Sequence, residues 1–127
     1  MKLLLDTNRL SDALVGVAQV VETLEIAEAV YVPVIALGEL RAGFLKGRRP
    51  AKNETRLQWF LSQDGVSTVE VSASVSHRYA QIHAALRRAG TPIPTNDLWI
   101  AAIAIEHGLC LYTRDAHFRH VPGLACL

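Results

Sequence analysis

Four short apolar runs recur along the chain, and stretches with helical spacing separate them. The runs are residues 2–5 (KLLL), 30–34 (VYVPV), 67–71 (STVEV) and 109–113 (LCLYT). Short apolar runs of this kind are typical of strands that are covered on both faces of a sheet. A fifth, shorter strand is expected at residues 124–126.

The segments between these runs place apolar residues three and four positions apart, which is the period of a helix with one buried face. The expected helices are residues 11–29, 35–46, 55–62, 73–89 and a nearly all-apolar helix that opens at Thr95 or Asn96 and ends at Gly108. Residues 47–54 (GRRPAKNE) are expected to interrupt the helical pattern. Strands that alternate with helices predict an α/β fold, with a parallel sheet covered on both sides.

Length, composition and charge narrow the picture further. The 127 residues fit one domain, residues 1–127, and a hydrophobic fraction of 50% excludes a disordered chain. Thirteen basic residues against twelve acidic ones leave a net charge of +1, so any signal for nucleic-acid binding has to be local.

The chain carries no sign of a membrane or an oxidising compartment. No apolar run reaches the roughly 20 residues of a membrane span, and the apolar part of the start, MKLLLDTN, is too short for a signal peptide. Cys110 and Cys126 lie in apolar surroundings, which predicts buried free thiols. We therefore expect a cytoplasmic protein.

Four of the twelve acids stand where strands end or helices begin. Asp6 follows the first strand directly, and Asp115 comes two residues after Thr113, at the end of the fourth strand. Glu39 lies in the first turns of the helix after the second strand, and Asp97 opens the apolar helix. Because functional crevices of parallel sheets lie past the carboxyl ends of the strands, these acids are expected at one edge.

Gathered carboxylates favour a bound cation. Two like charges at about 4 Å repel by about 4 kcal/mol at an effective dielectric constant of about 20. A helix N-terminus at Asp97 offsets only about 0.3–1 kcal/mol of this repulsion. A hard divalent ion such as Mg²⁺ fits better, because it prefers oxygen ligands and can stabilise charge on a phosphoryl group. Each acid alone also has an ordinary explanation, as a helix cap, a turn residue or a rim residue; their joint placement favours a site.

The four acidic segments resemble a known family. LLLDTNRLSD, PVIALGELRAGF, PTNDLWIAAIAIEHG and LYTRDAHF are similar to segments of PIN-domain nucleases, and most similar to the VapC-type toxins of toxin–antitoxin pairs. The resemblance covers essentially the whole chain. Each segment alone is a weak signal, but all four appear in order, with the acids 33, 58 and 18 residues apart.

The resemblance implies a three-layer α/β/α sandwich around a parallel sheet of four to five strands. It also implies a Mg²⁺- or Mn²⁺-dependent endoribonuclease that hydrolyses RNA and is neutralised by a cognate antitoxin, as a homodimer or as a toxin–antitoxin hetero-oligomer. The family's catalytic and metal-binding acids map onto Asp6, Glu39, Asp97 and Asp115. The residues expected to hydrogen-bond these carboxylates and fix their rotamers are Thr7, Asn8 and Thr113.

Candidate contacts to RNA and to the antitoxin lie elsewhere. Arg114, beside Asp115, is the best candidate for a phosphate contact. The basic stretch from residue 41 to 56, in which Arg41, Arg48 and Arg49 stand out, is expected to form a loop that either follows a phosphate backbone or is simply solvated. Trp59 and Phe60 are candidates for a groove that takes an antitoxin helix, although a core position is the simpler interpretation of Phe60. His117 stands two residues after Asp115 and can approach the same pocket, but the histidines do not form a zinc motif.

Three other functions compete with the nuclease. A haloacid-dehalogenase-like phosphatase needs a second Asp two residues after the first, where this chain has Asn8, and a Lys near the later acids, where it has Arg114. A response-regulator receiver needs a phosphoacceptor Asp at the third strand, and STVEVSAS contains none. A non-catalytic nucleic-acid-binding PIN module would keep the fold without the chemistry. All four acids are present in this chain, so nothing in the sequence favours that alternative.

Overall fold

The computed structural model describes residues 1–127, and a four-stranded parallel sheet forms its centre. The strands are β1 (Lys2–Leu5), β2 (Ala29–Pro33), β3 (Val66–Val69) and β4 (Cys110–Tyr112), in the order β3-β2-β1-β4. β1 pairs on both sides, with Leu4 opposite Tyr31 of β2 and Leu111 of β4. This central position explains why β1 is almost wholly apolar.

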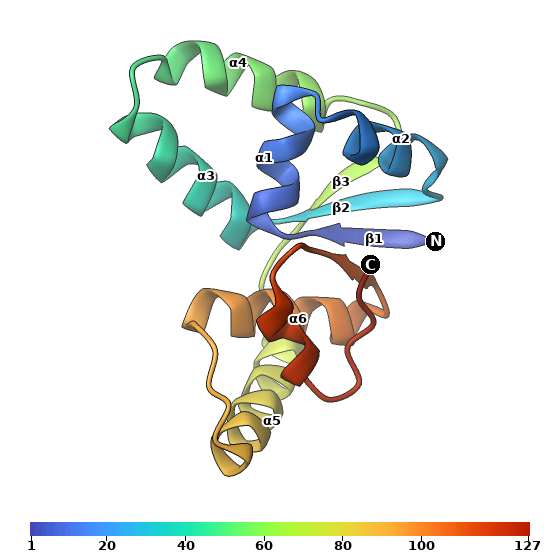
Figure 1. The fold of residues 1–127 in the computed structure, drawn as a ribbon, viewed down its shortest axis with the longest axis vertical. Helices are drawn as coiled ribbons and strands as arrows, with labels where there is room; N and C mark the ends of the chain where they lie inside the picture. Colours follow the sequence, from blue (N-terminus) through green and yellow to red (C-terminus); the bar gives the residue numbers. More distant parts are fainter.

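Helices cover both faces of the sheet (Figure 1). On one face lie α1 (Thr7–Val15), α2 (Ala18–Ile26), α3 (Val34–Lys46) and α4 (Pro50–Leu61). On the other lie α5 (Ala73–Ala89), α6 (Thr95–His107) and the short 3₁₀ helix η1 (Ala116–His120). The predicted three-layer α/β/α architecture is confirmed.

Two hydrophobic cores follow from the alternation of side chains along the strands. Leu3 and Leu5 pack into the core beneath α1–α4, whereas Leu4 packs into the core beneath α5 and α6. α6 contributes six buried residues to the second core, which explains its lack of a polar face. None of the helices combines the length and the hydrophobicity needed to span a bilayer.

Several boundaries differ from the sequence-based expectation. The helix predicted at residues 11–29 is two helices, because Gly16 adopts a left-handed conformation (φ 79°) that ends α1. The helix predicted at residues 55–62 begins at Pro50, since proline has no amide proton to lose and a φ suited to a first helical turn. The interruption is therefore limited to residues 47–49.

Two expectations about burial are wrong. β3 is an edge strand, and its adjacent residues Ser67 and Thr68, which point to opposite faces of the sheet, are both exposed, so this strand is not covered on both faces. Cys126 is exposed and Cys110 is half-buried, so the two free thiols are not both in the core. The predicted short fifth strand is reduced to a single parallel bridge between Leu111 and Cys126, which extends the sheet beyond β4.

Candidate active site

The four acids come from four separate segments and line one pocket. Asp6 follows β1 and is the N-cap of α1, Glu39 lies in the second turn of α3, Asp97 in the first turn of α6, and Asp115 after β4. The pocket has a volume of about 460 Å³, and its lining residues are polar or acidic apart from Pro94. Its lining residues are Asp6, Thr7, Asn8, Glu39, Pro94, Thr95, Asn96, Asp97 and Asp115. The expectation that these acids meet at one edge is confirmed.

Asp6 is the best-fixed carboxylate of the pocket. It is only 3% exposed, and both of its oxygens accept hydrogen bonds. The backbone N–H of Thr7 donates to Oδ1 (2.8 Å) and the hydroxyl of Thr113 donates to Oδ2 (2.7 Å). A buried carboxylate requires such donors, so Asp6 is held in one orientation at the end of β1.

Neutral side chains also hold Glu39 and Asp115. The Thr7 hydroxyl donates to Oε1 of Glu39 (2.9 Å), and the Asn8 amide donates to Oδ2 of Asp115 (3.2 Å). The backbone N–H of Asp115 donates in turn to the Thr113 hydroxyl (3.0 Å). Thr7, Asn8 and Thr113 therefore lie where the sequence placed them, as hydrogen-bond partners of the acids.

Asp97 has a partner, His117, that was not among the predicted site residues. Nε2 of His117, in η1, lies 2.8 Å from Oδ2 of Asp97, and the His117 ring packs against Phe118 at 4.8 Å between ring centroids. The position of His117, two residues after Asp115, was the only sequence signal for this contact. Its contact with Asp97, twenty residues earlier, depends on how η1 folds back onto α6.

Burial and mutual repulsion make two of the carboxyls weaker acids. Burial raises the pKa of Asp6, and the charges of Asp115 and Glu39 add to this, while the hydrogen bonds from Thr113 and Thr7 oppose it. Burial also raises the pKa of Asp97, and the charge of Asp6 adds to it, while His117 opposes it. The site therefore has an excess of negative charge that its own residues do not neutralise.

Three carboxylate oxygens remain available to a ligand. Oε2 of Glu39, Oδ1 of Asp97 and Oδ1 of Asp115 accept no hydrogen bond, and none of them is a buried unsatisfied atom. No three acidic, histidine or cysteine side chains already stand as ligands around a single point. The pocket thus offers open oxygen ligands at its wall, and not a closed cage.

The sequence has a match among known families. Residues 3–124, nearly the whole chain, match the PIN domain family. The chain belongs to the PIN-domain family. Among its relatives is a protein named ribonuclease VapC4 from Mycobacterium tuberculosis, which is 34% identical over 93 residues, 73% of this chain and 72% of the relative.

Solved structures of VapC-type PIN domains share the whole fold. The structure of VapBC2 from Rickettsia felis, bound to a DNA fragment from its promoter, matches with a TM-score of 0.91 and 27% identity, covering 100% of this chain and 98% of that chain. A DNA-bound VapBC from Salmonella typhimurium matches with a TM-score of 0.91 and 26% identity, covering 100% and 97%. The predicted resemblance to VapC-type PIN domains is confirmed.

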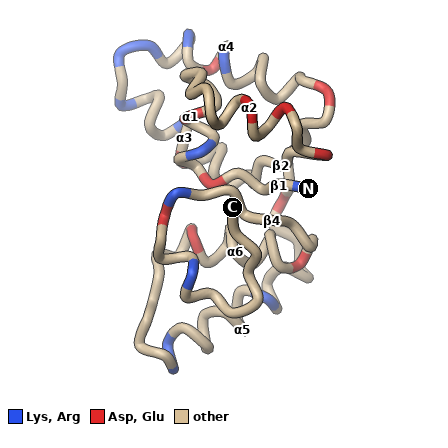
Figure 2. The backbone as a smooth tube through the Cα atoms, turned by 45° about the vertical axis from the view of Figure 1, so that its right-hand side comes forward, with Lys and Arg blue, Asp and Glu red and all other residues tan.

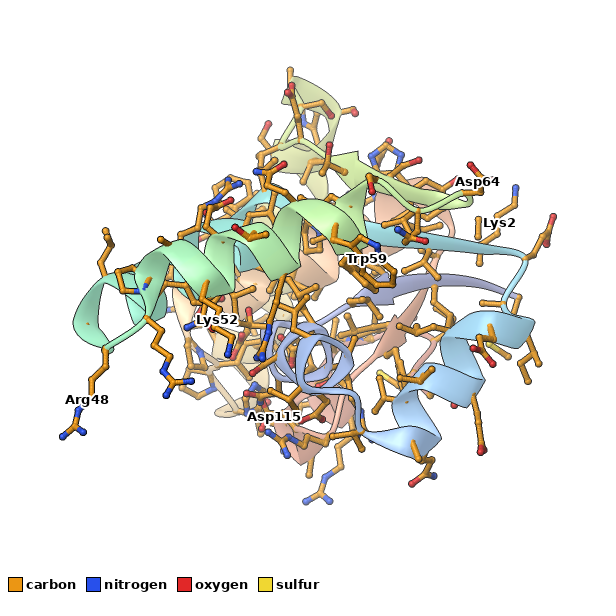
Figure 3. The ribbon with its side chains drawn as sticks, turned by 90° about the horizontal axis from the view of Figure 1, so that it is seen from above. Lys2, Arg48, Lys52, Trp59, Asp64 and Asp115 are labelled. Atoms are coloured by element: carbon orange, nitrogen blue, oxygen red, sulfur yellow. The ribbon has the colours of Figure 1, made fainter.

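The arginines predicted to contact nucleic acid occupy two regions of this PIN domain. Arg114 precedes the pocket residue Asp115 but does not itself line the pocket. It is 55% exposed, with its guanidinium 3.7 Å from a carboxylate oxygen of Asp12. Arg41 donates two hydrogen bonds to Glu54 of α4 (2.9 and 3.0 Å), so its guanidinium is already engaged. Arg48 and Arg49 are exposed at the turn between α3 and α4, where Arg48 extends outward (Figure 3).

The basic stretch is not the loop that the sequence predicted. Arg41 lies within α3, and Lys52 and Arg56 lie within α4, so the charges sit on a helical hairpin with a three-residue turn. Lys46, the last residue of α3, is about 10 Å along the helix axis from Glu39. The hairpin tip is therefore separated from Glu39 by about half of α3.

Proposed function

We propose that this PIN domain is a metal-dependent endoribonuclease of a toxin–antitoxin pair that acts in the cytoplasm. The observation that carries the proposal is the meeting of Asp6, Glu39, Asp97 and Asp115 in one polar pocket. The relative named ribonuclease VapC4 supports RNA as the substrate. The family match favours this function over a haloacid-dehalogenase-like phosphatase.

A hard divalent cation, Mg²⁺ or Mn²⁺, fits the residues present. The pocket offers carboxylate oxygens as donors, and burial, with a smaller contribution from the neighbouring carboxylates, raises the pKa values of Asp6 and Asp97. Mg²⁺ usually takes one or two carboxylates and completes its coordination with water, so an open wall of ligands suits it. Asp97 and Asp6 would be its main ligands, Asp6 through the second lone pair of an oxygen that already accepts a hydrogen bond. Asp115 would complete the site, and Glu39 would reach the ion through a bound water.

The residues of the pocket would have different roles in phosphodiester hydrolysis. A divalent ion held in this pocket would lower the pKa of a bound water and offset the charge that develops on the phosphoryl group. The free Oε2 of Glu39 would accept a proton from the attacking water, while Thr7 holds its other oxygen. Arg114, exposed beside Asp115, binds the negatively charged RNA backbone.

An RNA cleavage assay tests the proposal directly. Purified protein is expected to cut RNA internally with Mg²⁺, to stop in EDTA and to recover when Mg²⁺ returns. Asp97→Asn is expected to lose at least about 100-fold in rate, or about 3 kcal/mol of barrier. The control Asp64→Asn, at an exposed turn, keeps the activity. Cleavage that survives exhaustive chelation, or in Asp97→Asn, overturns the proposal.

A groove for the antitoxin lies between α1 and α4. It is lined by Ala13, Leu14, Val15, Gly16, Thr55, Arg56, Trp59 and Phe60. Val15 is 68% exposed and Trp59 66%, whereas Phe60 is half-buried against the core. A second hollow shares Leu14, Val15 and Arg56 with this groove and shares Thr7, Asn8 and Glu39 with the acid pocket. An antitoxin segment seated on Trp59 could therefore extend to the catalytic acids.

Inhibition by the antitoxin tests the role of this groove. Trp59→Ala is expected to weaken inhibition of RNA cleavage about tenfold or more, because exposed aromatic anchors dominate interfaces, and to leave the uninhibited rate unchanged. Ile26→Ala is the matched control, since Ile26 is 86% exposed but lies outside the groove. Equal inhibition of both variants would remove the groove from the proposal. Gel filtration of the pair distinguishes a homodimer from a hetero-oligomer.

A further inference from the structure

A second cavity borders the acid pocket and has no role in the chemistry described above. It has a volume of about 360 Å³, within the range of small-molecule sites, and lies where α5 ends and α6 begins. Its lining residues are His83, Leu86, Arg87, Pro92, Ile93, Thr95 and Leu98. Thr95 lines both this cavity and the acid pocket, so the two spaces are separated by the width of one residue.

The chain builds this cavity with a short, stiff connection. Gly90 ends α5 in a left-handed conformation (φ 71°), and Pro92 and Pro94 restrict the backbone that leads into α6. Leu86 and Leu98 are 2% and 4% exposed and form an apolar floor. Pro92 and Ile93 of the connection line the cavity beside this floor.

The polar rim of the cavity is positive and aromatic. Arg87 takes part in none of the ion pairs of the molecule, and no acidic residue lines the cavity. His83 ends a row of stacked rings: its ring lies 6.1 Å from that of Tyr79 at 22°, and Tyr79 lies 3.9 Å from Trp99 at 24°. A flat ring, an apolar floor and a free guanidinium suit a planar base that is attached to a phosphate.

We propose that the cavity between α5 and α6 binds a nucleobase of the RNA that flanks the cleaved phosphodiester. The inference rests on the proposed ribonuclease function and adds to it a subsite that helps to select the cleavage position. The base packs on Leu86 and Leu98 beside His83, and Arg87 contacts the adjoining phosphate. The acid pocket, reached past Thr95, holds the scissile group.

Two pairs of matched variants test this subsite. Arg87→Ala is compared with Arg88→Ala, which removes an exposed arginine from the same last turn of α5 but does not line the cavity. His83→Ala is compared with His77→Ala, which removes an exposed histidine of α5 outside the cavity. Thermal melts establish that each variant folds. If Arg87→Ala does not fold, the histidine pair provides the test of the subsite.

Binding and cleavage are measured separately. A short fluorescein-labelled RNA is titrated in EDTA, where nothing is cut, and anisotropy is recorded. Arg87→Ala is expected to bind about tenfold more weakly than wild type, and Arg88→Ala within about twofold of it. With Mg²⁺ and a randomised RNA, Arg87→Ala and His83→Ala are expected to change the distribution of cut sites and raise KM, with kcat within about threefold of wild type.

The outcomes separate this subsite from the nuclease itself. Equal binding and equal cut-site distributions for Arg87→Ala and Arg88→Ala overturn the subsite while RNA cleavage by wild type stands. Equal weakening by both variants overturns it too, because it indicates general charge attraction. If Arg87→Ala changes only inhibition by the antitoxin, the cavity belongs to a protein partner. If wild type cuts no RNA, the subsite and the proposed function both fail.

Discussion

The acid pocket and the basic tip of the α3–α4 hairpin are both charge clusters, but they are built differently (Figure 2). In the pocket, the carboxylates come from four segments: Asp6 is buried, Asp97 and Asp115 are half-buried and Glu39 is exposed. Each of them accepts a hydrogen bond from a named neighbour. At the tip, Arg48 and Arg49 follow each other in sequence and are exposed. The carboxylates that the fold brings together are therefore held in place by hydrogen bonds, whereas two adjacent exposed arginines in a turn are free to move.

Electrostatics follows from this difference in construction. Burial and neighbouring acids raise the pKa of Asp6 and Asp97, so the pocket stores unfavourable charge that a cation relieves. In the hairpin, Arg41 and Glu54 already neutralise each other, and the pKa of Glu54 is lowered by its hydrogen bond from Arg41. The pocket is therefore suited to chemistry, and the hairpin tip at most to attraction.

The largest expected effect comes from neutralising one glutamate in each region. Glu39→Gln is expected to reduce RNA cleavage by at least about 100-fold, since it removes a charge from the pocket that nothing else replaces. Glu54→Gln is expected to change the rate by less than about twofold and the stability by less than about 1 kcal/mol, as for an exposed ion pair. Initial rates and thermal melts measure both. Comparable rates for the two variants would mean that the pocket is not the catalytic centre.

His117 gives the next largest effect, because it is the one side chain that holds Asp97. His117→Leu removes the donor and is expected to lower the Mn²⁺ affinity about 10- to 100-fold, measured by electron paramagnetic resonance without RNA. His117→Gln can keep an N–H near the same place and is expected to recover much of that affinity. His120→Leu, in the same 3₁₀ helix and exposed, is the control. Equal affinity of wild type and His117→Leu would contradict a positioning role.

The positions and contacts of particular residues show which parts of the site could be predicted from the sequence. Asp6 and Asp115 follow parallel strands, and the carboxyl ends of such strands must share an edge, so their meeting was predictable from topology. The partner of Asp97 was not, because the path of η1 depends on how Phe118 and Val121 pack into the core. The start of α4 was also missed: the proline and charges of GRRPAKNE resemble a loop, yet Pro50 begins a helix.

The basic tip is expected to affect binding more than chemistry. Arg48→Ala with Arg49→Ala is expected to raise KM about two- to fivefold and leave kcat unchanged. The slope of log KM against log salt concentration should fall by up to about 1.4, since each lost phosphate contact to a single strand contributes about 0.7. Arg114→Ala, beside the acids, is the informative comparison, with a larger rise in KM. An unchanged salt slope in the double variant would identify the tip as a solvated turn.

The smallest expected effect is on stability, and it runs against the usual direction for a lost charge. Burial raises the pKa of Asp97 in the folded protein above the ordinary 3.8. The favourable contribution of its protonated carboxyl to folding stability is therefore fully present below pH 3.8, and it is lost as the pH rises through the pKa of the folded state. Without a divalent ion, Asp97→Asn is therefore expected to melt about 2–5 °C above wild type at pH 7, and the gap should close towards pH 4. Mg²⁺ should then raise the Tm of wild type more than that of Asp97→Asn, because the ion binds the folded carboxylate. A lower Tm for the variant at pH 7 would mean that the hydrogen bond from His117 outweighs the burial of charge, and that the pocket is a stabilising cluster without need of a cation.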